Sequence, residues 1–155
     1  MSQSNLSHLI SPRSIAVVGH RGADFAIRGS LTLGYNGKIW AVHPSRETIE
    51  GLDCFKSVRD LPEPPDATFI AVNAEAAIEI VTDLSQIRGG GAVLYASGFG
   101  EVGEEGVKRH QRLVEAAGKM PIIGPNCYGF INSLDKFALW PDLHGCEALN
   151  KGVAI

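Results

Sequence analysis

Apolar residues in this chain gather in short runs, and each run stops at a glycine, a proline or a polar turn. Short runs rich in β-branched side chains are typical of strands buried on both faces of a sheet. The second run ends at His43-Pro44, because proline cannot donate a hydrogen bond to a sheet. The pattern predicts five buried strands, at residues 14–18, 38–42, 67–72, 92–96 and 121–123.

Between the strands, apolar residues recur at helical spacing. A first helix is predicted over residues 24–33, with Asp24 placed to cap its first turn and Gly34 placed to end it. The clearest helix follows the third strand, where Asn73 can act as the cap and the apolar pattern continues to Gly89. A third, amphipathic helix is predicted over residues 104–117, before Gly118.

Strands that alternate with helices predict an α/β fold, a doubly wound parallel sheet of Rossmann-like type covered on both faces. In such folds the ligand binds beyond the carboxyl ends of the strands. The residues to inspect are therefore those that follow each strand, at 19–24, 43–46, 73–74, 97–101 and 124–129.

Composition and charge narrow the class of protein. A chain of 155 residues with 45% hydrophobic residues can bury one core, so we expect a single domain over residues 1–155. A net charge of −3 gives no basic field to attract nucleic acid. No apolar run approaches the roughly 20 residues that span a membrane, and the polar amino terminus carries no signal core, so we expect a cytoplasmic protein.

Cysteine usage and the last residues add two expectations. The three cysteines are widely spaced, which argues against a disulfide framework and against a structural zinc site. We therefore predict no metal site. Residues 152–155 begin like another buried strand, so we expect this domain to be the first part of a longer protein.

The turn after the first strand is a candidate phosphate site. Gly19, Arg21, Gly22, Ala23 and Asp24 put glycines and backbone amides at the start of a helix, where anions bind well. The alternative is that glycine is needed here only for the backbone turn. The dinucleotide fingerprint Gly-x-Gly-x-x-Gly is absent, which weakens a prediction of NAD.

After the second strand, an NAD site needs an acidic residue, whereas this chain has His43, Pro44, Ser45 and Arg46. A guanidinium suits a phosphate on a ribose, which both NADP and coenzyme A carry. The alternatives are that Arg46 is an ordinary surface residue and that His43 is a packed ring.

Two later loops complete the candidate site. Ser97 and Gly98 follow the fourth strand, and residues 124–129 (GPNCYG) specify a fixed backbone shape that includes Asn126 and Cys127. A cysteine nucleophile needs a base, and the sequence identifies none for Cys127. We therefore predict no catalytic residue in this chain.

Several of these segments, in order and spacing, resemble the coenzyme A-binding domain of NDP-forming acyl-CoA synthetases, a family that includes the α subunit of succinyl-CoA synthetase and ADP-forming acetate–CoA ligases. The resemblance runs nearly end to end. It rests on residues 11–19 (SPRSIAVVG), 34–39 (GYNGKI), 42–44 (VHP), 60–66 (DLPEPPD), 97–101 (SGFGE) and 124–129 (GPNCYG).

The resemblance implies where coenzyme A binds. It implies phosphate contacts at the turn of residues 21–24 and a basic contact at Arg46. It implies that Asn73 and Ala74 line the pantetheine arm, where the family usually has proline at the first position. The loop after the fourth strand corresponds to Ala96, Ser97 and Gly98. A second departure is the His20-Arg21-Gly22 turn, which replaces the family's commoner Ala-Ser turn.

The resemblance also implies a reaction for the longer protein. The family joins a carboxylic acid to coenzyme A with ATP or GTP and Mg²⁺, through an acyl phosphate and a phosphorylated histidine of the following domain. The partners implied are that second domain and an ATP-grasp domain or subunit. This chain is then expected to bind coenzyme A without turnover. The alternatives are an NADP-binding Rossmann oxidoreductase or sensor, and a regulatory coenzyme A-binding domain of a protein acetyltransferase.

Overall fold

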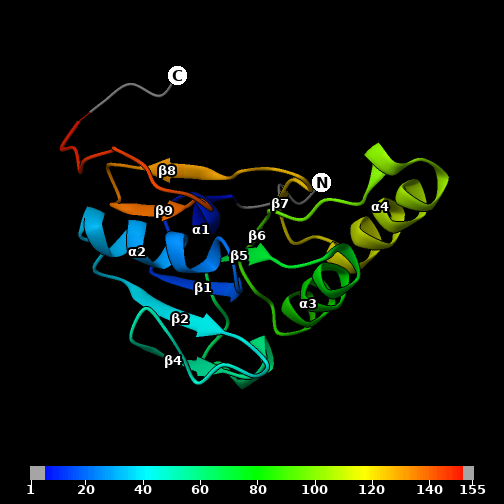
Figure 1. Ribbon diagram of the computed structural model, residues 1–155, viewed down its shortest axis with the longest axis horizontal. Coiled ribbons are helices and arrows are strands. Elements are labelled where there is room, and N and C mark those ends of the chain that lie inside the picture. The colour runs from blue at the N-terminus through cyan, green and yellow to red at the C-terminus, as the bar shows by residue number, and fades with distance from the viewer. Residues whose placement is uncertain (1–5, 152–155) are drawn as a thin grey trace.

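The computed structural model describes residues 6–151 and contains a seven-stranded sheet with helices on both faces (Figure 1). The five predicted strands are present as β1 (Ser14–Gly19), β2 (Lys38–Val42), β5 (Ala67–Ala71), β6 (Ala92–Leu94) and β7 (Ile122–Ile123). They pair in parallel, and β1 lies between β2 and β5. The predicted doubly wound α/β class is confirmed.

Two further strands extend the sheet beyond β2. They are β3 (Thr48–Ile49) and β4 (Leu52–Phe55), which form an antiparallel pair, with β4 parallel to β2. The sequence pattern did not predict them, because β4 is short and only partly buried at the sheet edge. The order of the parallel strands, β4-β2-β1-β5-β6-β7, is that of the Rossmann fold.

Helices cover the two faces of the sheet with separate hydrophobic clusters. On one face lie α3 (Ala74–Gln86) and α4 (Glu104–Ala117), and Phe99 is fully buried beneath them. On the other lies α2 (Ala23–Leu33), which packs against the hairpin of β8 (Phe130–Asn132) and β9 (Phe137–Leu139) (Figure 1). The hairpin was not predicted, and neither were α1 (Ser7–Ile10), η1 (Val58–Asp60) and η2 (Gly100–Val102).

Two helix boundaries differ from the prediction. The cap position of α2 is Gly22, with φ of 89°, so Asp24 is not the cap; its carboxylate accepts the N–H of Phe25 instead. At the end of α3 the left-handed conformation falls on Arg88, with φ of 62°, rather than on Gly89. The predicted ends at Gly34 and Gly118 are confirmed, since both are the C-caps of their helices.

The order in which strands are added to the sheet reverses at β1, because β2 lies on one side of it and β5 on the other. In doubly wound folds ligands bind at such a reversal, which here lies at the carboxyl ends of β1 and β5. Gly19 is required there, because a Cβ at this position would lie 2.3 Å from the carbonyl oxygen of Ala71.

Two further expectations from the sequence concern the carboxyl terminus of the chain and membrane-spanning segments. The strand predicted at residues 152–155 lies outside the described residues. Within residues 6–151, no helix is long and apolar enough to cross a membrane.

Candidate functional site

The start of α2 offers unpaired backbone amides. Gly22 occupies the cap position and has no side chain to cap the helix, while the carboxylate of Asp24 accepts the N–H of Phe25 in the first turn. The first N–H groups of a helix have no partner inside it, and they carry the positive end of its dipole. Arg21 is exposed immediately before this turn. A glycine turn that leads into a helix is therefore present where the sequence predicts a phosphate site, and Ala23 is the first helical residue.

The turn after β2 is organised by His43. Its Nδ1 accepts the backbone N–H of Ser45 at 3.2 Å and that of Arg46 at 3.0 Å. A ring nitrogen that accepts carries no proton, so the ring is the neutral tautomer with its proton on Nε2. Burial lowers the pKa of His43, and the charges of Arg46, His20 and Lys56 lower it further. His43 thus holds the backbone that presents Arg46.

Basic side chains from three strand ends gather beside this turn. The rings of His20 and His43 lie 6.2 Å apart, and Lys56, directly after β4, donates from Nζ to the carbonyl oxygen of Arg46 at 3.1 Å. We call His20, Arg21, His43, Arg46 and Lys56 the basic cluster. Lys56 was missed, because its position becomes visible only once β4 is recognised.

The cationic members of the basic cluster form no ion pair within the described part of the chain. One carboxylate lies near them, because the pKa of Glu50 is lowered by its hydrogen bond to Arg28 and also by the charge of Arg46. Among the ion pairs of residues 6–151, none involves Arg21, Arg46 or Lys56. Nearby Arg28, in contrast, forms a two-pronged ion pair with Glu50. The cluster therefore carries positive charge that a bound anion can neutralise.

The start of α3 lies next to the loop after β6. The side-chain oxygen of Asn73 accepts the N–H of Ala76 at 3.0 Å, which confirms the predicted cap. A Cβ placed on Gly98 would lie 3.6 Å from the Cβ of Ala74, so these two predicted site residues are neighbours. Ser97, which lies between Ala96 and Gly98 in the sequence, is exposed.

The loop at residues 124–129 packs beside residues 96–98. The N–H of Asn126 donates to the carbonyl oxygen of Ala96 at 2.8 Å, and that of Cys127 donates to Leu94 at 3.2 Å. The sulfur of Cys127 accepts the N–H of Gly129 at 3.3 Å. No base among the described residues hydrogen-bonds this thiol, so the structure supplies no pair for nucleophilic catalysis.

The candidate residues thus form one row along the carboxyl edge of the sheet. Pro44 and Arg46 follow β2, the glycine turn follows β1, Asn73 and Ala74 follow β5, and the two loops follow β6 and β7. Neighbouring strands lie about 4.8 Å apart, so this row of five strands is about 19 Å long. Such a row suits an extended ligand with its anionic end at β2 and a less charged part toward β7.

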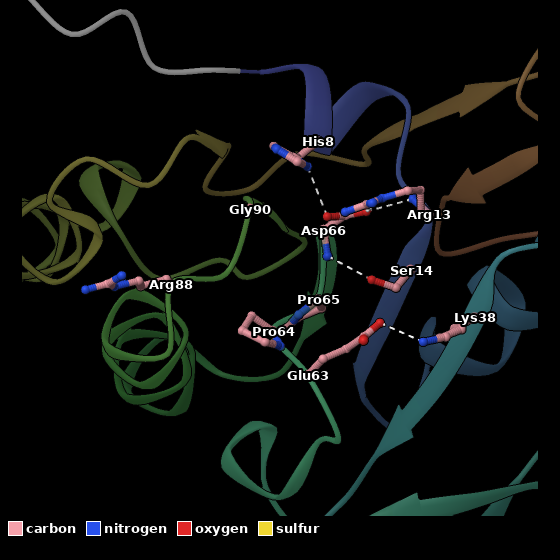
Figure 2. Close-up of a pocket in the computed structure, with 10 residues that line it drawn as sticks. All are labelled: His8, Arg13, Ser14, Lys38, Glu63, Pro64, Pro65, Asp66, Arg88 and Gly90. Carbon is pink, nitrogen blue, oxygen red and sulfur yellow. Dashed lines mark hydrogen bonds and ion pairs between the residues drawn. The ribbon is translucent and has the colours of Figure 1, made fainter.

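A cavity with a volume of about 620 Å³ lies at the opposite, amino edge of the sheet. Figure 2 shows His8, Arg13 and Ser14 converging on Asp66 there, while Arg88 points away. Asp66 pairs with His8 and Arg13, and Lys38 pairs with Glu63. Since these charges neutralise one another and doubly wound folds bind ligands at the carboxyl edge, we assign the candidate site to the basic cluster and its neighbouring loops.

Comparison with known proteins places this geometry in a family. Residues 13–133 match the family described as the CoA binding domain. The 4-hydroxybutyrate–CoA ligase (ADP-forming) of Nitrosopumilus maritimus is 33% identical over 132 residues, which are 81% of this chain and 19% of that protein. Subunit alpha of acetate–CoA ligase (ADP-forming) I of Pyrococcus furiosus is 36% identical over 138 residues, 82% of this chain and 30% of that protein.

A solved structure agrees with these relatives. The dinucleotide forming acetyl-coenzyme A synthetase 1 of Ca. Korarchaeum cryptofilum, in complex with phosphate and ADP, superposes with a TM-score of 0.82 at 28% identity. The match covers 89% of this chain and 31% of that one. The chain spans less than a third of the length of these relatives. Because the family match extends over most of the sequence, the chain belongs to the CoA binding domain family.

Proposed function

We propose that this chain binds coenzyme A along the carboxyl edge of its sheet, as one part of an ADP-forming acid–CoA ligase. The observation that carries the proposal is the basic cluster: among the described residues Arg21, Arg46 and Lys56 form no ion pair, and Arg21 directly precedes the glycine that begins α2. Coenzyme A has a diphosphate and a ribose 3′-phosphate at one end and a pantetheine arm at the other. That distribution of charge matches the row of site residues.

The roles follow from the order of the strands. The amides of Gly22, Ala23 and Asp24 with Arg21 would hold the diphosphate. Arg46 and Lys56 would hold the 3′-phosphate through charged hydrogen bonds. The pantetheine arm would run between Asn73-Ala74 and the loop at residues 96–98, toward the loop that contains Asn126 and Cys127.

The chemistry of the whole protein belongs to parts outside this chain. The relatives are ligases that form ADP, so the proposed reaction joins a carboxylic acid to coenzyme A with ATP and Mg²⁺, and releases ADP and phosphate. A second domain and an ATP-grasp domain or subunit would carry the phosphoryl transfer, and this chain would hold the thiol toward them. Unpaired Cys54, Cys127 and Cys146 suit the reducing cytoplasm.

Titration calorimetry with coenzyme A, dephospho-coenzyme A and NADPH tests the proposal. Arg46→Ala and Lys56→Ala should each weaken coenzyme A about tenfold, the loss expected for one charged hydrogen bond, and should have little effect on dephospho-coenzyme A. Lys38→Ala is the matched control. Lys38 is the first residue of β2, the strand that Arg46 follows, but it pairs with Glu63 at the opposite edge of the sheet. Tight NADPH binding with no response to coenzyme A would overturn the proposal in favour of the NADP alternative.

A further inference from the structure

Arg109 of α4 links two parts of the candidate site without belonging to either. Its Nη1 donates to the carbonyl oxygen of Gly98 at 3.1 Å, and its Nε donates to the carboxylate of Glu75 at 3.1 Å. Gly98 lies in the loop after β6, and Glu75 lies in the first turn of α3. One guanidinium therefore spans the two elements between which the pantetheine arm is proposed to run.

A second charged side chain holds the other side of Gly98. The carboxylate of Glu101 accepts the N–H of Gly98 at 2.5 Å and that of Phe99 at 3.1 Å. These N–H groups lower the pKa of Glu101, so it remains an anion near neutral pH. The N–H and the carbonyl of Gly98 are thus both bound by charged groups.

Gly98 needs these contacts because its backbone is otherwise adaptable. It has a φ of 97°, and glycine adopts positive φ values about as readily as negative ones. The neighbouring Phe99 is fully buried, and a Cβ on Gly106 would lie 1.6 Å from its carbonyl oxygen, so α4 packs directly on the loop. The loop is anchored at Phe99, while Arg109 and Glu101 set the orientation of the peptide groups just before that anchor.

We propose that Arg109, supported by Glu75 and Glu101, is a positioning residue that holds the peptide groups of Gly98 against Ala74 at the start of α3, the surface over which the pantetheine arm is proposed to pass. The inference rests on the proposed coenzyme A function and extends it to residues outside the proposed row of ligand contacts. Arg109 acts through the loop and does not touch the ligand itself. Its loss should therefore weaken the binding of the pantetheine part of coenzyme A and spare the part held by the basic cluster.

Arg112 provides a matched control for Arg109. It lies on the same helix and also pairs with Glu75, through Nη2 at 2.9 Å, but among the described residues it forms no hydrogen bond or ion pair with the loop. Arg109→Met should weaken coenzyme A about tenfold and leave adenosine 3′,5′-bisphosphate, which lacks the pantetheine arm, unchanged. Arg112→Met should leave both affinities within about twofold, as expected for an exposed ion pair.

Glu101→Gln is the second variant, because it keeps the size of the side chain and serves even if Arg109→Met folds poorly. It should show the same selective loss, whereas Glu105→Gln, which removes only the exposed pair with Lys108, should not. Equal coenzyme A affinity of the Arg109 and Arg112 variants would overturn the inference, and so would a parallel loss of the bisphosphate. If the unmodified chain binds no coenzyme A, the proposed function itself is wrong. If the unmodified chain binds coenzyme A but the Arg109 and Glu101 variants show no selective loss, only the positioning role is wrong.

Discussion

The Nδ1 of His43 accepts a hydrogen bond from the backbone N–H of Arg46 at 3.0 Å, so the imidazole ring stabilises the backbone of the turn that carries Arg46. The same nitrogen also accepts the N–H of Ser45. The side-chain oxygen of an asparagine at position 43 would occupy the position of Nδ1 and accept the same backbone N–H groups, as asparagine does in turns. The role of His43 is therefore one that asparagine can fill and alanine cannot.

We expect His43→Ala to weaken coenzyme A about fivefold to tenfold, because one or two turn hydrogen bonds are lost and Arg46 is no longer held in place. His43→Asn should retain affinity within about twofold. Titration calorimetry of the two variants beside the unmodified chain measures this. If asparagine fails as badly as alanine, the ring itself contacts the ligand and the turn is not its main role.

The stability of the turn should depend on pH. The pKa of His43 is lowered in the folded chain by burial and by the facing charges of Arg46, His20 and Lys56. A lowered histidine pKa means that the unfolded chain takes up the proton first. The contribution of His43 is thus complete above its ordinary pKa of about 6.5 and is lost as the pH falls through the lowered value.

The measurement is the difference in unfolding midpoint between the unmodified chain and His43→Asn at pH 7.5 and pH 5. The asparagine variant should gain relative stability at the lower pH, since its oxygen stays an acceptor. A difference that does not change with pH would show that His43 keeps its unprotonated Nδ1 throughout this range, contrary to the expectation.

Strongly patterned elements could be predicted from sequence, and residues that act through tertiary contacts could not. The strands of the sheet and α3 were predicted because apolar runs and a clear helical period mark buried faces. By contrast, β4 is partly exposed along its length, so no run marks it, and the role of Lys56 after it was hidden. The hairpin of β8 and β9 was missed although all three residues of β9 are buried, because each of its strands has only three residues.

The start of α2 shows a different limit. Asp24 has the side chain of a good cap, but the backbone leaves the helix at Gly22, and residue type alone did not indicate which position would be the cap. The link from Arg109 joins residues 11 and 34 positions away, and such a separation leaves no local pattern. The sequence therefore predicted the row of candidate ligand contacts, whereas the residues that hold this row in place became visible only in the fold.

Gly19→Ala should be strongly destabilising. Its Cβ would lie 2.3 Å from the carbonyl oxygen of Ala71, and its φ of 129° is one that alanine rarely adopts. We expect a loss of about 3 kcal/mol in the free energy of unfolding, measured by urea denaturation. Gly34→Ala is the control, because it also has a positive φ but nothing lies within 4 Å of its Cβ; it should cost about 1 kcal/mol. Equal losses would mean that backbone conformation, rather than the approach of β1 to β5, requires glycine at position 19.

At the amino edge, Asp66 should make the fold sensitive to acid. Burial alone would raise its pKa, but the backbone N–H and guanidinium of Arg13, together with His8, outweigh burial and lower it (Figure 2). A carboxylate with a lowered pKa stabilises the fold above its ordinary pKa of about 3.9, and this contribution is lost as the pH falls through the lowered value.

Asp66→Asn should therefore reduce the free energy of unfolding by about 2 kcal/mol at pH 7, because a buried carboxylate loses charged hydrogen bonds from Arg13 and His8. Its deficit should shrink between pH 7 and pH 3, because the unmodified chain begins to lose the same charge as the pH falls toward the lowered pKa of Asp66. Urea denaturation at the two pH values measures this, with exposed Asp53→Asn as the control that should change little. A deficit that stays constant between pH 7 and pH 3 would mean that the asparagine is penalised for its shape rather than for the missing charge.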